Sequence, residues 1–195
     1  MFALPLGEDG AELRPLETWH AAEFLAHIER GRDFIGTYIT FGQSVVDEES
    51  ARELLCDYGA KRVADTGFLY GIWDGCGRPG GGTLVGGVLF RVFDAATGVC
   101  EIGCWLEPAG TGRGLVTRAC RVLADWAFHE RHMHRVEWWA VSANTASIAV
   151  ARRLGMRREA VLRESYPRGG VRHDSEGWAV LAHEWAARNE DGPHP

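Results

Sequence analysis

The sequence predicts an α/β fold, with strands and helices alternating along the second half of the chain. The apolar run Cys100–Leu106 has the length and composition of a buried strand. Arg135–Val141 is a second strand, rich in bulky residues, and the segment after it predicts a helix that stops at Gly155. Between these strands a helix is indicated by apolar residues at helical spacing: Leu115, Ala119, Val122, Leu123, Trp126 and Ala127.

The first half of the chain predicts further strands at Glu12–Leu16, Phe68–Trp73 and Leu84–Phe93. Thr18 is expected to cap a helix whose apolar residues are Ala21, Phe24, Leu25 and Ile28. A second helix is predicted from Asp47 to about Val63. The glycine-rich loop Gly75–Gly82 is expected to be a mobile hairpin tip between two of the strands.

Length and composition favour one domain with a sizeable core. The chain has 195 residues, of which 46% are hydrophobic. We expect residues 1–188 to form this single domain. Residues 189–195 are polar and contain two prolines, so we expect a flexible C-terminal tail.

Several classes of protein are disfavoured by the composition. No stretch approaches the roughly 18 consecutive apolar residues of a membrane helix, and the acidic N-terminus lacks the regions of a signal peptide. The five cysteines lack a framework spacing and predict reduced thiols in the cytoplasm. A net charge of −6 disfavours non-specific nucleic-acid binding. Arginine greatly outnumbers lysine, which indicates a GC-rich bacterial genome.

The segment Gly112-Arg113-Gly114 lies between a predicted strand and a predicted helix, and this arrangement presents backbone N–H groups to a phosphate. A P-loop is excluded because the sole lysine of the chain is Lys61. A Rossmann fingerprint is excluded because Thr117 stands where the third glycine is needed. The turn therefore predicts a pyrophosphate held by amides and Arg113. Two arginines further along the helix could assist or simply be solvated: Arg118 and Arg121.

This order of elements resembles the GNAT acyltransferases, which use acetyl-coenzyme A. Their turn pattern Q/R-x-x-G-x-G/A falls on Ala109–Gly114, where both glycines match and the leading Gln or Arg is absent. One phosphate contact of the family is therefore in doubt here. The likeness covers residues 12–187 and is strongest to the Rim-type branch, which acetylates the N-termini of ribosomal and other proteins. The segments that carry it are Glu101–Leu106, Asn144–Ser147, Ala151–Met156, Leu162–Ser165 and His173-Asp174.

The resemblance implies a mixed, splayed central sheet of six to seven strands flanked by about four helices. It implies that pantetheine binds the main chain of Cys104, Trp105 and Leu106, where a nearby amide polarises the thioester carbonyl. No metal ion is expected either. The turn and helix start are expected to hold the rest of the coenzyme through Thr111, Gly112, Arg113, Gly114, Leu115, Val116, Thr117 and Arg118.

The same resemblance implies a general acid that protonates the leaving coenzyme thiolate. Many family members use a tyrosine, but that position is Ala151 here, and the Rim-type branch has a serine one turn earlier. Ser147 is therefore the expected acid, and Asn144 is expected to orient pantetheine or a water molecule. The alternative is that Asn144 and Ser147 only cap a helix.

The attacking amine must lose a proton, and two carboxylates could accept it. Glu101 matches a strand carboxylate that serves as base in some family members, and apolar neighbours would raise its pKa. Glu164 follows the strand residues Ala160–Leu162, which line the acceptor side in related folds. A third alternative is that the amine binds already neutral, which costs only a factor of about ten for an N-terminal amine.

Other clusters have structural interpretations. Cys100 and Cys104 would lie ~13 Å apart along a strand, too far to share a metal ion. His173 and Asp174 would point to opposite faces of a strand, so we expect them in a loop that shapes the acceptor site. The pair Trp138-Trp139 is expected in the core and at an interface.

The function predicted from these residues is acetyl transfer from acetyl-coenzyme A to a primary amine. A protein N-terminal amine is the first hypothesis, as in the Rim-type branch. A small amine such as an antibiotic or a polyamine is the second, and a non-catalytic acyl-coenzyme A-binding module is the third. Rim-type proteins are monomers or dimers, and we favour a homodimer.

Overall fold

The computed structural model describes residues 3–8, 10–76 and 81–190. The chain divides into two compact units. The first comprises Met1–Arg91 and Gly103–Cys120, and the second comprises Val92–Ile102 and Arg121–Pro195. Strands β4 (Thr83–Asp94) and β5 (Val99–Leu106) each contribute residues to both units.

The first unit has an antiparallel sheet in the order β1, β2, β3, β4. Strand β1 (Leu4–Pro5) pairs with β2 (Glu12–Pro15), and β2 pairs with β3 (Phe68–Asp74). Strands β3 and β4 pair along their length, with a bulge between Ile72 and Trp73. The predicted hairpin is confirmed at both strands, while residues 77–80 of its glycine-rich loop lie outside the described residues.

The helices of the first unit are α1 (Ala21–Gly36), the short α2 (Phe41–Ser44) and α3 (Glu48–Val63). The predicted start of α3 is confirmed: Asp47 is its N-cap, and the carboxylate accepts from the backbone N–H of Ser50 at 2.8 Å. The prediction for Thr18 is wrong. A 3₁₀ turn, Thr18–His20, precedes α1, because Glu17 and His20 cap each other's backbone before that turn.

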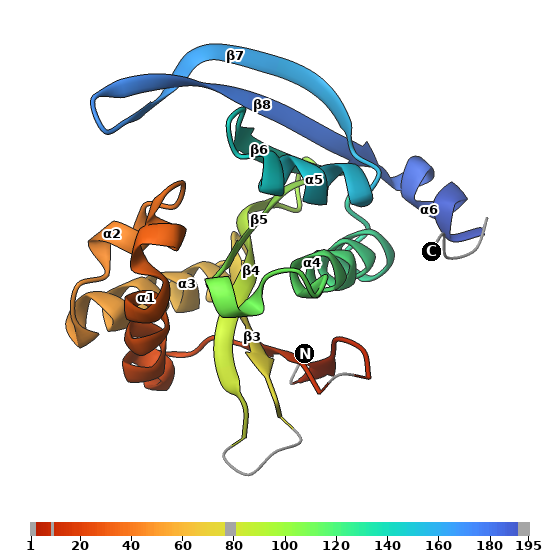
Figure 1. The fold of residues 1–195 in the computed structure, drawn as a ribbon. Helices are drawn as coiled ribbons and strands as arrows, with labels where there is room; N and C mark the ends of the chain where they lie inside the picture. Colours follow the sequence, from red (N-terminus) through yellow and green to blue (C-terminus); the bar gives the residue numbers. More distant parts are fainter. Residues whose placement is uncertain (1–2, 9, 77–80, 191–195) are drawn as a thin grey trace. The chain divides into compact units, whose positions relative to one another are not determined.

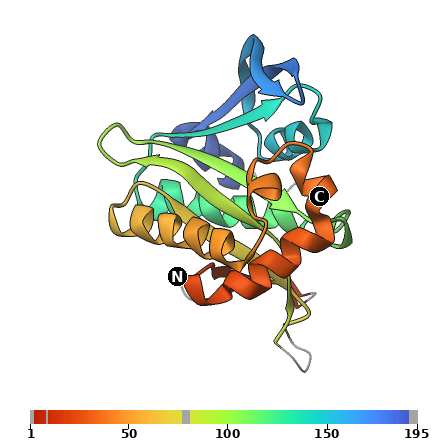
Figure 2. The same cartoon turned by 90° about the vertical axis from the view of Figure 1, so that its left-hand side faces the viewer.

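The core of the first unit lies between α1, α3 and one face of the strands. Figure 2 shows these two helices lying along that face. Phe24 and Ile28 of α1 and Leu55 of α3 are buried there with Trp105 of β5. Since a buried aromatic or aliphatic side chain contributes about 1.5–3 kcal/mol, this cluster anchors the end of β5.

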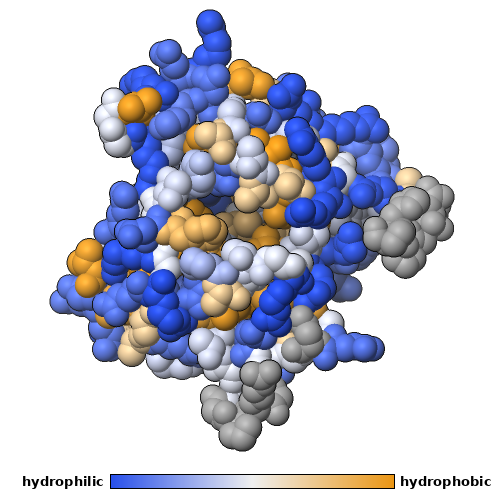
Figure 3. Space-filling view, viewed as in Figure 1, coloured by the Kyte–Doolittle hydropathy of each residue, from blue (hydrophilic) through white to orange (hydrophobic). Residues whose placement is uncertain are grey.

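The second unit is built around strand β6 (Arg135–Val141). The start of β5 pairs with β6 in parallel, and β6 pairs antiparallel with β8 (Val171–Leu181). Strand β8 forms a long hairpin with β7 (Arg157–Arg168), which Figure 1 shows as two extended ribbons. Apolar residues interrupt the hydrophilic surface of this hairpin (Figure 3), including the exposed Val161, Leu162 and Val171.

Helix α5 (Thr145–Arg153) connects β6 to β7, and α6 (Ala182–Glu190) follows β8. Helix α4 (Leu115–Asp125) begins in the first unit and ends in the second, where a π-helical turn, Trp126–Glu130, extends it. A 3₁₀ turn, Pro108–Gly110, links β5 to the glycine turn before α4.

The mixed α/β fold is as predicted, although the described residues form eight strands and six α-helices rather than six to seven and about four. The strand order is β1-β2-β3-β4-β5-β6-β8-β7. Elements as short as β1 and α2 contain too few residues to show a periodicity. Helix α6 extends to Glu190, into the segment expected to be a tail, and residues 191–195 lie outside the described part.

The expectation of a loop at His173 and Asp174 is wrong. Both residues lie within β8, and His173 pairs with Tyr166 of β7. The strand extends this far because β7 and β8 continue to pair as a hairpin up to the turn after Arg168.

All five cysteines are free thiols. Within the described ranges, no three His, Cys, Asp or Glu side chains are grouped so that they could hold a metal ion. The helices in those ranges are too short or too polar to cross a membrane.

Candidate functional site

The turn before α4 has an open backbone that depends on two glycines. Gly112 and Gly114 have φ angles of +76° and +70°, which L side chains rarely adopt, and no heavy atom lies within 4 Å of a Cβ added at either. The hydroxyl of Thr111 donates to the carbonyl of Pro108 at 2.8 Å, at the start of this turn. Helix α4 follows directly, and the N–H groups of its first turn have no acceptor within the helix. The turn can therefore present main-chain donors to an anion.

Arg113 lies within this turn and is paired with a carboxylate. Its guanidinium donates to both carboxylate oxygens of Asp74 at the end of β3, at 2.5 and 2.9 Å. Arg118, one turn into α4, donates to the main-chain carbonyl of Arg113 at 3.2 Å. The structure thus brings the two predicted phosphate-binding arginines together. Arg118 stabilises the turn by its hydrogen bond to the main chain, and Arg113 pairs with Asp74. A contact of either with pyrophosphate stays a prediction.

The main chain at the end of β5 is approached closely by two glycines of β4. A Cβ added to Gly86 would lie 2.5 Å from the carbonyl oxygen of Trp105, and one added to Gly87 would lie 2.2 Å from its ring. Only glycine fits at either position. Beyond Trp105 and Leu106, the N–H of Glu107 donates to the carbonyl of Val85 at 2.9 Å. These contacts hold β4 close against the end of the predicted pantetheine-binding strand.

Cys104 lies beside a second thiol. It is hydrogen-bonded to Cys120 of α4, and burial followed by this contact raises the pKa of Cys120. Cys120 is completely buried, whereas Cys104 is half-buried. The neutral thiol of Cys120 thus joins the start of α4 to the strand that carries Trp105 and Leu106.

A buried chain of polar groups, which sequence reasoning missed, holds Trp105. Its indole Nε1–H donates to Nε2 of His27 at 3.0 Å, so the ring proton of the neutral imidazole lies on Nδ1. That Nδ1 lies 3.2 Å from Oε2 of Glu107, which also accepts from Arg30 at 3.0 Å. Burial and then the charge of Arg30 lower the pKa of His27 to about 4. No signal in the sequence could have paired His27 with residues about 80 positions away.

In the second unit, Asn144 and Ser147 lie at the start of α5. Asn144 is the N-cap, and its Oδ1 accepts from the N–H of Ser147 at 3.1 Å, so the capping interpretation is confirmed for Asn144. The hydroxyl of Ser147 has a different partner. Its Oγ accepts from the indole N–H of Trp138 on β6 at 2.9 Å.

Glu101 lies on β5 in the second unit, opposite Glu137 of β6. Paired residues of neighbouring strands point to the same face of a sheet, and adjacent residues of one strand point to opposite faces. Glu101 therefore lies on the face opposite to Trp138, the face that Ser147 contacts. The candidate base and the candidate acid thus lie on opposite faces of these strands.

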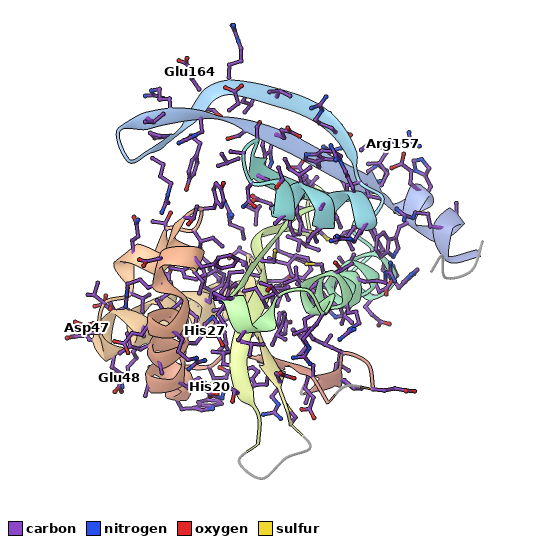
Figure 4. The ribbon with its side chains drawn as sticks, in the orientation of Figure 1. His20, His27, Asp47, Glu48, Arg157 and Glu164 are labelled. Carbon is purple, nitrogen blue, oxygen red and sulfur yellow. The ribbon has the colours of Figure 1, made fainter. Side chains whose placement is uncertain are left out.

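Glu164 lies in an irregular part of β7 and is exposed. Its φ angle is +51°, a conformation that side-chain-bearing residues rarely adopt. Its N–H donates to the carboxylate of Asp174 at 2.8 Å, and its carbonyl accepts from Arg172 at 3.0 Å. These two β8 residues hold the strained backbone, while the side chain of Glu164 points outward from the hairpin (Figure 4).

Comparison with known proteins points to one enzyme family. The model of the acetyltransferase (GNAT) domain matches residues 11–157. The Bacillus subtilis (strain 168) protein YdaF, described as a putative ribosomal N-acetyltransferase, is 29% identical over 178 residues, which are 89% of this chain and 92% of the relative.

Solved structures agree with the family match. A crystal structure of a probable acetyltransferase has a TM-score of 0.85 at 27% identity, with 95% of this chain and 99% of that one covered. RimL, a ribosomal L7/L12 α-N-protein acetyltransferase solved in complex with coenzyme A, has a TM-score of 0.84 at 19% identity. The match covers 92% of this chain and 97% of RimL, and it shows a shared fold.

Proposed function

This chain belongs to the GNAT acetyltransferase family, and from that membership we propose that it acetylates the α-amine of a protein N-terminus with acetyl-coenzyme A. The observation that carries the coenzyme assignment is the open turn with positive φ at Gly112 and Gly114. Main-chain donors there suit a diphosphate, because the amides and the dipole at the start of α4 favour negative charge.

The proposed binding mode places pantetheine along the main chain of Cys104, Trp105 and Leu106. Two observations support it: the glycines of β4 that hold this strand closely, and the buried chain through His27 that orients Trp105. A main-chain amide near Trp105 would donate to the thioester oxygen as negative charge develops on it. One such donor typically contributes about 3 kcal/mol to the transition state.

The proposed reaction is direct attack of the amine nitrogen on the thioester carbonyl. Ser147 protonates the sulfur as the carbon–sulfur bond breaks, and Glu101, which lies on the other face of the strands, accepts the amine proton through water. We prefer Glu101 to Glu164, because Glu101 is half-buried and Glu164 is exposed and points outward. An N-terminal amine suits this chemistry, since its pKa of about 8 leaves roughly a tenth neutral at pH 7.

The acceptor class is supported by the name of YdaF, a putative ribosomal N-acetyltransferase, at 29% identity. The test compares three peptides: one with a free N-terminus, one N-terminally blocked with an internal lysine, and one that is blocked without lysine. Release of free coenzyme thiol is the readout, and we expect it with the first peptide alone.

Calorimetric titration with acetyl-coenzyme A separates the possible failures. Binding with no turnover on any peptide or small amine would favour a non-catalytic binding module. Turnover on polyamines or aminoglycosides but not on peptides would replace the protein acceptor by a small amine. Absence of binding would contradict the proposed coenzyme site itself.

A further inference from the structure

We infer that Trp138 is a positioning residue for the acetyl transfer, because its indole N–H donates to the Ser147 hydroxyl and directs the hydroxyl proton elsewhere. This inference rests on the proposed role of Ser147 as general acid. The distance from Nε1 of Trp138 to Oγ of Ser147 is 2.9 Å, and only 1% of Trp138 is exposed.

The direction of the hydrogen bond carries the argument. An indole nitrogen can only donate, so Oγ of Ser147 must be the acceptor in this pair. The hydroxyl hydrogen cannot lie on the line to Trp138 and is left to donate to another group. The N–H of Ser147 is bonded to Oδ1 of Asn144 at 3.1 Å. Ser147 is therefore held at both its backbone and its hydroxyl oxygen, with one proton to give.

This geometry suits a proton donor to a leaving thiolate. When the carbon–sulfur bond breaks, its electron pair stays on sulfur, and sulfur takes the proton from Oγ of Ser147. The indole N–H stabilises the negative charge that develops on Oγ. The resulting alkoxide regains the proton that the amine has released to Glu101, through water, so that free thiol and amide are the only products.

The chain contains a matched comparison for this contact. Trp178 of β8 pairs directly opposite Trp138, and 7% of it is exposed. Its indole N–H donates to Oε2 of Glu176 at 3.1 Å, not to a candidate catalytic group. The two tryptophans thus share a buried setting in one sheet and differ in the group that receives their N–H.

The test replaces each tryptophan by phenylalanine. We expect Trp138→Phe to lower kcat about five- to tenfold, the range for losing one hydrogen bond, with little change in the Kd for coenzyme A. Trp178→Phe should keep kcat within about twofold of the parent protein. In a Ser147→Ala background, Trp138→Phe should cause no further loss of kcat, because the indole of Trp138 acts only through the hydroxyl of Ser147.

Three results would overturn the inference. They are an equal loss of kcat in both tryptophan variants, an unchanged kcat in Trp138→Phe, and a further loss in the Ser147→Ala background. If Ser147→Ala itself keeps the parent kcat, the role of Ser147 in the proposed function fails as well, which distinguishes the two claims. Benzothienylalanine at position 138 keeps the bicyclic shape without the N–H and should reproduce the loss even if the phenylalanine variant folds poorly.

Discussion

At the scale of single residues, the most unusual group is the imidazole of His27. His27 lies on α1 and is labelled in Figure 4. Its ring is completely buried between the indole of Trp105 and the carboxylate of Glu107. Arg30, on the same helix, also contacts Glu107. The imidazole accepts one hydrogen bond through Nε2, so protonation at that atom would break the bond to Trp105.

This setting predicts a stability that depends on pH. The pKa of His27 is about 4 in the folded protein against an ordinary 6.5, so the unfolded chain binds more protons between these values. The free energy of unfolding should therefore be fully maintained above pH 6.5 and fall by roughly 3 kcal/mol as the pH drops to 4 and below. Urea denaturation at pH 7 and at pH 4 measures the difference. His27→Gln should lose less stability on acidification, and an equal loss in both proteins would contradict the assignment.

A second prediction at this scale distinguishes the two carboxylates. Glu101→Gln should lower kcat by about 100-fold, the lower range for general-base catalysis, with coenzyme affinity retained. Glu164→Asn should keep kcat near the parent value and change the free energy of unfolding by less than about 0.5 kcal/mol, since asparagine tolerates positive φ. Steady-state kinetics with a peptide acceptor gives both values. The opposite pattern would make Glu164 the base.

At the scale of elements, the glycine turn before α4 is the feature most directly coupled to binding. Gly112 has space for a methyl group but a φ angle of +76°, so a side chain there causes backbone strain without a clash. Strain of this kind costs about 1–2 kcal/mol per residue and is relieved by rotation of the adjacent peptide groups. Those peptide groups are the proposed phosphate ligands.

Gly112→Ala should therefore raise the Kd for coenzyme A about tenfold, as measured by calorimetry. Gly169→Ala in the β7–β8 turn is the matched control, because Gly169 also has a positive φ of +56° and open space around a Cβ. The control should lose similar stability and bind coenzyme A with unchanged affinity. Equal weakening in both variants would show that the turn at Gly112 has no special part in binding.

At the scale of the whole molecule, the negative net charge and the anionic coenzyme make local positive potential necessary. The chain carries a formal charge of −6, so the proposed binding of coenzyme would rely on the turn, its arginines and the start of α4. A ligand that binds the folded protein alone stabilises it by mass action.

Coenzyme A at about 100 times its Kd should raise the free energy of unfolding by about 2.7 kcal/mol. Thermal unfolding monitored by circular dichroism, with and without the ligand, tests this expectation. At the same ligand concentration, the Gly112→Ala variant should gain about 1.4 kcal/mol less, given its tenfold weaker binding. A stabilisation that is equal in both proteins would place the ligand away from the turn.

Local sequence determined those features whose cause lies within a few residues. The helix start at Asp47, the stop at Gly155, the strand ending at Leu106 and the glycine turn all follow from short-range rules and are where they were predicted. The prediction for Thr18 failed although its cause is also local. Glu17 and His20 cap each other's backbone, and the sequence pattern did not show that this pair would replace a cap by Thr18.

The mixed α/β fold and the glycine turn before α4 could be inferred from the chain by itself, because apolar periodicity and glycine spacing are local properties, and the family followed from the resemblance of its motifs. Only the tertiary structure joined His27 to Trp105 and Glu107, and Trp138 to Ser147. These hydrogen bonds connect different helices and strands, so their partners depend on how the elements pack and not on spacing along the sequence. A buried polar group needs a hydrogen-bond partner, and packing decides which residue is near enough to be that partner. This is the physical reason why His27 bonds to Trp105, and Trp138 to Ser147.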